Sequence, residues 1–130
     1  MMKKDLRSPL AKAKGLGASG SGSHHFWLQR MTALALIPII MYLVFSIALI
    51  PEASYSAVIA WLQAPFNAIM MALLVVVSFQ HAHLGLQVIL EDYLSNHSTR
   101  LIAIIAVKFI SYFMMAAGLY AIIKITLGGH

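Results

Sequence analysis

The sequence predicts an all-α integral membrane protein with three transmembrane helices. Of its 130 residues, 61% are hydrophobic and only 10% are charged, which lies outside the range of soluble domains. The apolar residues form three blocks, at about residues 31–50, 66–90 and 101–127, each long enough to cross a bilayer. An open chain in lipid satisfies its backbone hydrogen bonds only as helix, so each block is expected to be helical.

The charged residues predict the domain organisation and the orientation. Five of the nine Lys and Arg residues precede residue 15 and a Gly/Ser-rich stretch follows, so residues 1–23 are expected to be a flexible basic cytoplasmic tail. Residues 24–130 then form the membrane domain. The loop at 51–65 has no Lys or Arg, whereas the next loop ends with Arg100. The loop with Arg100 is therefore expected in the cytoplasm, and the C-terminus on the opposite side of the membrane.

The rest of the composition narrows the chemistry and the location. There is no cysteine, which excludes disulfides, thiolate zinc sites and iron–sulfur ligation by this chain. The net charge of +5 reports topology and not nucleic-acid binding. The tail lacks an amphipathic Arg-rich presequence pattern, so a bacterial inner membrane is expected.

Three helices bury few of their faces against each other, so a membrane partner is expected as well. Lys108 and Lys124 are expected to snorkel.

His81 gives the strongest functional signal in these blocks. It lies about 16 Å from Asp92 along a helix axis, near the middle of the hydrocarbon core. An ionisable side chain at this depth is costly, so by default it marks a functional site. His81, Gly85 and Asp92 share one helix face, and an imidazole next to a missing side chain suits axial ligation of a haem. The alternatives are a hydrogen bond from His81 to a neighbouring helix, and close helix packing at Gly85.

A second histidine, His83, points to nearly the opposite side of the same helix. The two cannot bind one iron together, and a hydrogen bond from His83 to a partner helix or a haem substituent is the favoured interpretation. The other histidines precede the first apolar block (His24, His25), lie in a loop (His97) or end the chain (His130). A six-coordinate haem is therefore expected to take its second axial ligand from another polypeptide.

Polar residues at the cytoplasmic rim indicate a quinone site. Asp92 and Tyr93 end the second block, where a lipid-soluble quinone headgroup meets water. Quinone reduction requires a hydrogen-bond donor to the carbonyl oxygen and a route for protons. Arg30, on the same side of the membrane, is placed to stabilise a reduced quinone or a haem propionate. The alternatives are an interfacial tyrosine, a solvated helix-end acid and an ordinary positive-inside arginine.

Two stretches carry a resemblance to a known family. Residues 24–33 read His-His-Phe-Trp-Leu-Gln-Arg-Met-Thr-Ala, and residues 81–93 read His-Ala-His-Leu-Gly-Leu-Gln-Val-Ile-Leu-Glu-Asp-Tyr. With the number and order of helices, they resemble the hydrophobic membrane-anchor subunit of succinate dehydrogenase, the small D-type partner of cytochrome b. That family shows an aromatic-x-x-Arg-x-Thr-Ala entry to the first helix, then His-x-x-x-Gly and a terminal Asp-Tyr. The resemblance runs from about Ser23 to the end of the chain.

The resemblance implies roles for these residues and partners for the chain. His81 is implied as an axial ligand of haem b, with Gly85 beside it. Tyr93 is implied as the hydrogen-bond donor to ubiquinone, with Asp92 beside it and Arg30 near the haem propionates and the quinone pocket. The implied partners are a cytochrome b-type anchor subunit, which shares the haem within a helical bundle, an iron–sulfur subunit and a flavoprotein subunit. The chain is then a non-catalytic subunit of respiratory complex II, which links the tricarboxylic acid cycle to electron transport.

Two alternative functions stay open at this point. The anchor of a related fumarate reductase preserves the chemistry and reverses the direction of electron flow. A small homo-oligomeric membrane transporter shares the short chain and the few helices. Proton-coupled exchangers of that size usually rely on an acidic residue inside a helix, and none of the four acids in this sequence lies mid-membrane.

Overall fold

The computed structural model describes residues 8–10 and 20–128. Residues 20–128 fold into three long α-helices and one short α-helix. They are α2 (Gly20–Ala48), α3 (Tyr55–Gln63), α4 (Pro65–Tyr93) and α5 (His97–Thr126). By length and composition, α2, α4 and α5 can each cross a membrane. The predicted fold class, an all-α membrane protein with three transmembrane helices, is confirmed.

The first long helix begins earlier than the apolar run indicates. Helix α2 starts at Gly20 and not near residue 31, so His24 and His25 lie within it. A helix can continue beyond the hydrocarbon core, because water or side chains can satisfy the N–H groups of its first turn. Here His25 Nε2 lies 3.2 Å from Gln87 Oε1 of α4. Most of the expected basic tail, at 1–7 and 11–19, lies outside the described residues.

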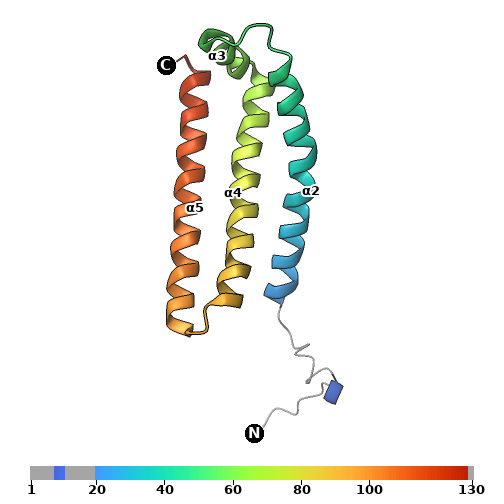
Figure 1. The fold of residues 1–130 in the computed structure, drawn as a ribbon, viewed down its shortest axis with the longest axis vertical. Helices are drawn as coiled ribbons and strands as arrows, with labels where there is room; N and C mark the ends of the chain where they lie inside the picture. The colour runs from blue at the N-terminus through green and yellow to red at the C-terminus, as the bar shows by residue number, and fades with distance from the viewer. Residues whose placement is uncertain (1–7, 11–19, 129–130) are drawn as a thin grey trace.

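The segment at 51–65, expected as a loop, contains the short helix α3. Ser54 caps its N-terminus, because Ser54 Oγ accepts a hydrogen bond of 3.2 Å from the backbone N–H of Ala57. Trp61 Nε1 donates to Ser46 Oγ of α2 at 2.6 Å, and Gln63 Nε2 donates to the Ile125 carbonyl of α5 at 3.2 Å. Through these hydrogen bonds α3 links α2 to α5 at one end of the protein. Figure 1 shows α3 at that end.

Local capping residues explain where α4 and α5 begin and where α5 ends. Pro65 occupies the first turn of α4, where its missing N–H costs nothing. Asn96 Oδ1 accepts from the backbone N–H groups of Ser98 at 3.0 Å and Thr99 at 3.5 Å, so α5 begins at His97 and not near residue 101. Gly128 follows α5 with φ of 83°, the left-handed conformation that ends many helices.

The three long helices are arranged with α4 in the middle. Helix α4 contacts α2 on one side and α5 on the other (Figure 1). The three-residue connection at 94–96 makes α4 and α5 antiparallel neighbours. Few side chains are buried, among them Leu43, Leu84 and Ile122, while large apolar side chains line the exterior along the length of the long helices. The exterior is therefore suited to lipid or to another membrane subunit.

Close packing between α4 and α5 depends on Gly118. A Cβ at this position would lie 2.9 Å from Val75 Cγ1 of α4, which is closer than real Cβ atoms approach a neighbour. Small residues of this kind let transmembrane helices approach each other where the hydrophobic effect contributes little. Sequence reasoning did not single out Gly118.

We expect Gly118→Leu to destabilise the assembled protein by about 1–3 kcal/mol, because the larger side chain forces α5 away from Val75. Thermal inactivation of the detergent-purified protein measures the effect. Ala121→Leu is the matched control, since Ala121 lies one turn later on α5 and is exposed. Equal losses in both variants would contradict the role given to Gly118.

Candidate functional site

His81 lies in the middle third of α4, half-buried at the contact with α2. Its Cα is about 18 Å along the helix axis from Tyr93, deep within the span. Its Nδ1 lies 3.0 Å from Thr32 Oγ1 of α2. Within the described residues no hydrogen bond involves Nε2 of His81. Nδ1 therefore contacts a neighbouring helix, as the alternative of a helix–helix hydrogen bond predicts, while Nε2 remains available to a ligand.

Gly85 follows His81 by one helical turn and is not required for packing within this chain. A Cβ built there meets only Gln29 Nε2, at 4.0 Å, which is ordinary van der Waals contact. Gly118 is the opposite case, since its Cβ would collide with Val75. The interpretation of Gly85 as a packing glycine between the helices of this chain is therefore not supported. The space beside it is free for a group from outside the chain.

His83 occupies a different environment from His81. Its side chain is only 3% exposed, and its ring centroid lies 5.8 Å from that of Tyr112 on α5. Its Nδ1 lies 3.3 Å from the carbonyl oxygen of Phe79 on its own helix. Because a carbonyl only accepts, Nδ1 of His83 carries the proton. The hydrogen bond is thus to its own helix, whereas the sequence analysis favoured a partner helix or a haem substituent.

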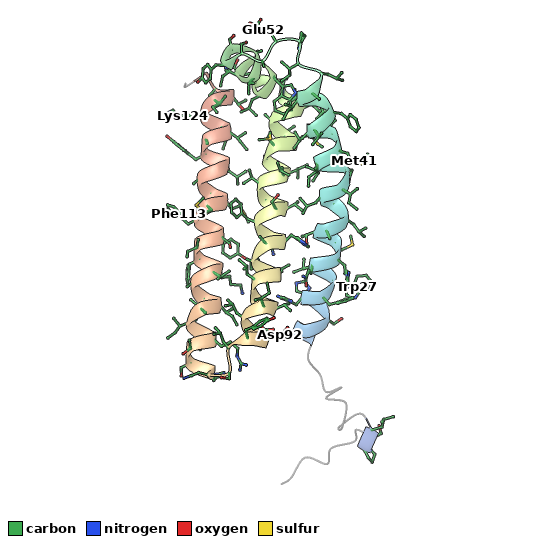
Figure 2. The ribbon with its side chains drawn as sticks, in the orientation of Figure 1. Trp27, Met41, Glu52, Asp92, Phe113 and Lys124 are labelled. Atoms are coloured by element: carbon green, nitrogen blue, oxygen red, sulfur yellow. The ribbon has the colours of Figure 1, made fainter. Side chains whose placement is uncertain are left out.

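The residues expected at the cytoplasmic rim lie at one end of the protein. Asp92 and Tyr93 end α4, and both are exposed, Tyr93 by 83%. Figure 2 places Asp92 and Trp27 at this end and Glu52 and Lys124 at the opposite end. Among the described residues no hydrogen bond or ion pair links Asp92 or Tyr93 to another side chain. The rim therefore presents free polar groups on an open surface.

Arg30 is not brought together with His81. It precedes Thr32 by two positions, so it lies on nearly the opposite side of α2 from the hydroxyl that contacts His81. Its Cζ lies 5.2 Å from the centroid of the Phe26 ring, within the range of a cation–π contact. The observed contact is that of an interfacial anchor.

Sequence reasoning missed a polar cavity between the three long helices. Its volume is about 710 Å³, and none of the predicted site residues lines it. Glu91 accepts a 2.9 Å hydrogen bond from Gln87 at this cavity, and Lys108 lies along it. The polar lining residues are His24, His25, Gln80, His83, Gln87, Glu91, Lys108 and Tyr112. The recurrence of Gln80, Gln87 and Glu91 at helical spacing is the sequence signal that could have found it.

The donor set fits a shared haem better than a metal site built by this chain alone. Among the described residues no group of three or more His, Cys, Asp or Glu side chains is placed to hold a metal ion. His81 offers one imidazole nitrogen without a hydrogen-bond partner among the described residues, with open space at Gly85 one turn away. A haem needs only one such ligand from each of two polypeptides.

These features define a class of protein: a helical membrane protein with three bilayer-length helices and a histidine donor at the α2–α4 contact. The sequence matches the model of the succinate dehydrogenase/fumarate reductase transmembrane subunit over residues 4–117. The chain belongs to this family. The resemblance drawn from residues 24–33 and 81–93 is confirmed.

Curated relatives are similar to the chain over most of its length. The succinate dehydrogenase hydrophobic membrane anchor subunit of Rickettsia bellii is 37% identical over 118 residues, which cover 91% of this chain and 94% of the relative. The succinate dehydrogenase membrane anchor subunit of Reclinomonas americana is 38% identical over 98 residues, covering 73% and 82%. The corresponding subunit of Paracoccus denitrificans is 30% identical over 121 residues, covering 93% of each chain. No solved structure matches the chain.

Proposed function

We propose that this chain is the membrane-anchor subunit of a succinate:ubiquinone oxidoreductase, respiratory complex II. In this role it supplies one axial ligand of haem b, contributes to the quinone-reduction site and docks the flavoprotein and iron–sulfur subunits to the bilayer. The observation that carries the proposal is His81, held through Nδ1 by Thr32 while Nε2 has no partner in the described chain. The names of the curated relatives support the same assignment.

The haem role follows from the surroundings of His81. Haem b, when bound, accepts and returns single electrons near the quinone site. His81 would hold its iron through Nε2, and Gly85 would leave room for the macrocycle beside α4. His83 is buried against α5 and His24, His25 and His97 lie near helix ends. A second ligand would therefore come from the cytochrome b-type anchor subunit.

The quinone role uses the free polar groups of the rim. Ubiquinone becomes quinol by taking up two electrons and two protons. The hydroxyl of Tyr93 donates a hydrogen bond to a quinone carbonyl oxygen, and the carboxylate of Asp92 exchanges protons with cytoplasmic water. Both side chains are exposed in this chain, so the partner subunits complete the pocket. Arg30 joins the pocket or the haem propionates only across that interface.

The charge distribution supports a multi-pass orientation in a bacterial inner membrane. The basic N-terminus and Arg100 mark the cytoplasmic side, where Asp92 and Tyr93 also lie. Glu52 and Lys124 lie at the opposite end (Figure 2). The soluble subunits then dock at the end that carries the rim residues. The chain has no cysteine with which to hold an iron–sulfur cluster, so electrons reach the rim from the partner subunits.

Two alternative functions, a fumarate reductase anchor and a small homo-oligomeric transporter, differ from this proposal to different degrees. The family description includes fumarate reductase, so an anchor working in the reverse direction shares every residue role given above. A transporter is disfavoured by position, because Glu91 and Asp92 lie in the last turn of α4 and Glu52 lies between α2 and α3.

We expect the chain, tagged and purified from its native membrane in mild detergent, to co-elute with a flavoprotein, an iron–sulfur protein and a second membrane anchor. Mass spectrometry of the eluate identifies these partners, and an optical scan detects the haem. The ratio of succinate oxidation to fumarate reduction in the same sample separates the two reductase directions. Recovery of the chain only as a homo-oligomer would contradict the proposal and favour the transporter.

A further inference from the structure

We propose that Thr32 is the positioning residue that fixes the tautomer of His81, so that Nε2 is the nitrogen presented to iron. This inference rests on the proposed haem role and deepens it. It assigns a function to a residue of α2 that otherwise looks like an ordinary threonine in a transmembrane helix. Three polar atoms surround the Thr32 hydroxyl oxygen.

The Thr32 hydroxyl has one hydrogen to donate and two lone pairs with which to accept. Its Oγ1 lies 2.7 Å from the Leu28 carbonyl oxygen, 3.0 Å from the Gln29 carbonyl oxygen and 3.0 Å from His81 Nδ1. Hydrogen bonds from O–H to O are typically about 2.7–2.8 Å long, and those from N–H to O about 2.9–3.0 Å. The distances therefore match a hydroxyl that donates to a carbonyl and accepts from the imidazole.

The opposite assignment is unfavourable. If Thr32 donated its hydrogen to His81 Nδ1, the Leu28 carbonyl oxygen would face Oγ1 at 2.7 Å with no hydrogen between them. A carbonyl cannot donate, so this contact would be repulsive. A neutral imidazole carries one ring hydrogen, and placing it on Nδ1 leaves the lone pair on Nε2. That lone pair is what an axial ligand requires.

The sequence makes Thr32 a rigid acceptor. Threonine in a helix commonly bonds the carbonyl four residues earlier, and Leu28 occupies that position. The branched Cβ also restricts rotation of the side chain. Since the hydroxyl is anchored on α2 and the ring is carried by α4, the contact sets the orientation of the ring. A hydrogen bond to the distal ring nitrogen also raises the basicity of the ligating one.

The test replaces the hydroxyl while keeping the shape. In the assembled complex, Thr32→Val removes the acceptor, and we expect haem affinity to fall about 10- to 100-fold. The midpoint potential of the remaining haem is expected to become more positive, because a less basic imidazole stabilises ferric iron less. Thr32→Ser, which retains the hydroxyl, is expected to restore both values. Haem content, a redox titration and the low-spin electron paramagnetic resonance signal are the measurements.

Thr126→Val is the matched control. Thr126 Oγ1 donates to the Ile122 carbonyl at 2.7 Å in the same way, but no histidine contacts it among the described residues. We expect this variant to keep the wild-type haem content and potential. Thr32→Ala provides a second, smaller substitution that removes the acceptor if the valine variant fails to assemble.

The outcomes separate this inference from the haem role itself. Wild-type haem content and potential in the Thr32→Val or Thr32→Ala complex would overturn the role of Thr32, while a lost haem signal in His81→Ala would still support ligation. A Thr32→Ser complex as defective as the valine variant would also overturn it, since the hydroxyl would not be the cause. An unchanged haem signal in His81→Ala would remove both proposals together.

Discussion

Replacing His81 by alanine is expected to abolish the low-spin haem spectrum of the assembled complex. The substitution removes the only described mid-span histidine whose Nε2 has no hydrogen bond and that lies beside an open glycine position. Loss of an axial ligand weakens haem binding, and we expect at least about a 10-fold fall in bound haem. Mutating a residue that only hydrogen-bonds a metal ligand already costs about 10-fold or more in affinity. The reduced-minus-oxidised optical spectrum of the purified complex measures the loss.

A histidine two positions away provides the control for this experiment. His83 is buried against Tyr112 and bonds the carbonyl of Phe79, so His83→Gln is expected to retain the low-spin spectrum. Electron transfer from succinate to a soluble acceptor in the membrane fraction checks that both variants assemble. If His81→Ala assembles and its spectrum matches the wild type, His81 is not the ligand.

Tyr93→Phe is expected to depress succinate-driven quinone reduction about 100-fold, the usual order of effect when one hydrogen-bond donor to a developing charge is removed. Phenylalanine keeps the ring and deletes the hydroxyl that the proposal directs to the quinone carbonyl. Electron transfer from succinate to a soluble artificial acceptor is expected to persist, because the role proposed for Tyr93 is limited to the quinone. Parallel assays with ubiquinone and with the artificial acceptor measure the two activities.

Tyr55→Phe is the corresponding control. Tyr55 begins α3 at the opposite end of the molecule and is 71% exposed, so loss of its hydroxyl should leave both activities unchanged. A parallel loss of both activities in Tyr93→Phe would indicate failed assembly and not a quinone defect. Full quinone reduction in that variant would exclude Tyr93 as the donor.

The sequence predicted the fold to the extent that apolar length determines it. Three blocks of bilayer length became three long helices, because lipid leaves the backbone no other way to pair its polar groups. The ends were less well predicted. Helix α2 extends back to Gly20, and His25 within this extension pairs with Gln87 of α4. Helix α3 forms because Ser54 caps it, while Trp61 and Gln63 donate hydrogen bonds to α2 and α5.

The sequence predicted where the candidate site residues lie along the helices better than it predicted their contacts. The depth of His81 and the rim position of Asp92 and Tyr93 follow from their spacing along one helix. The expectation that Arg30 lies near them rested on a shared side of the membrane and on the family resemblance, and it stays a prediction. Membrane side does not determine helix face, and the structure directs Arg30 toward Phe26 and away from the helix surface that carries Thr32.

What the sequence by itself determined is the number of spans, their helical state and the depth of each polar residue, since these depend on residue order and on 1.5 Å per residue. Which faces meet was decided only by the tertiary structure. The apolar residues of each long helix are spread over all of its faces, so hydrophobic patterning gives no preferred contact face. Small residues and hydrogen bonds select the contact face instead. Gly118 against Val75, and Thr32 against His81, are the contacts that this selection produced.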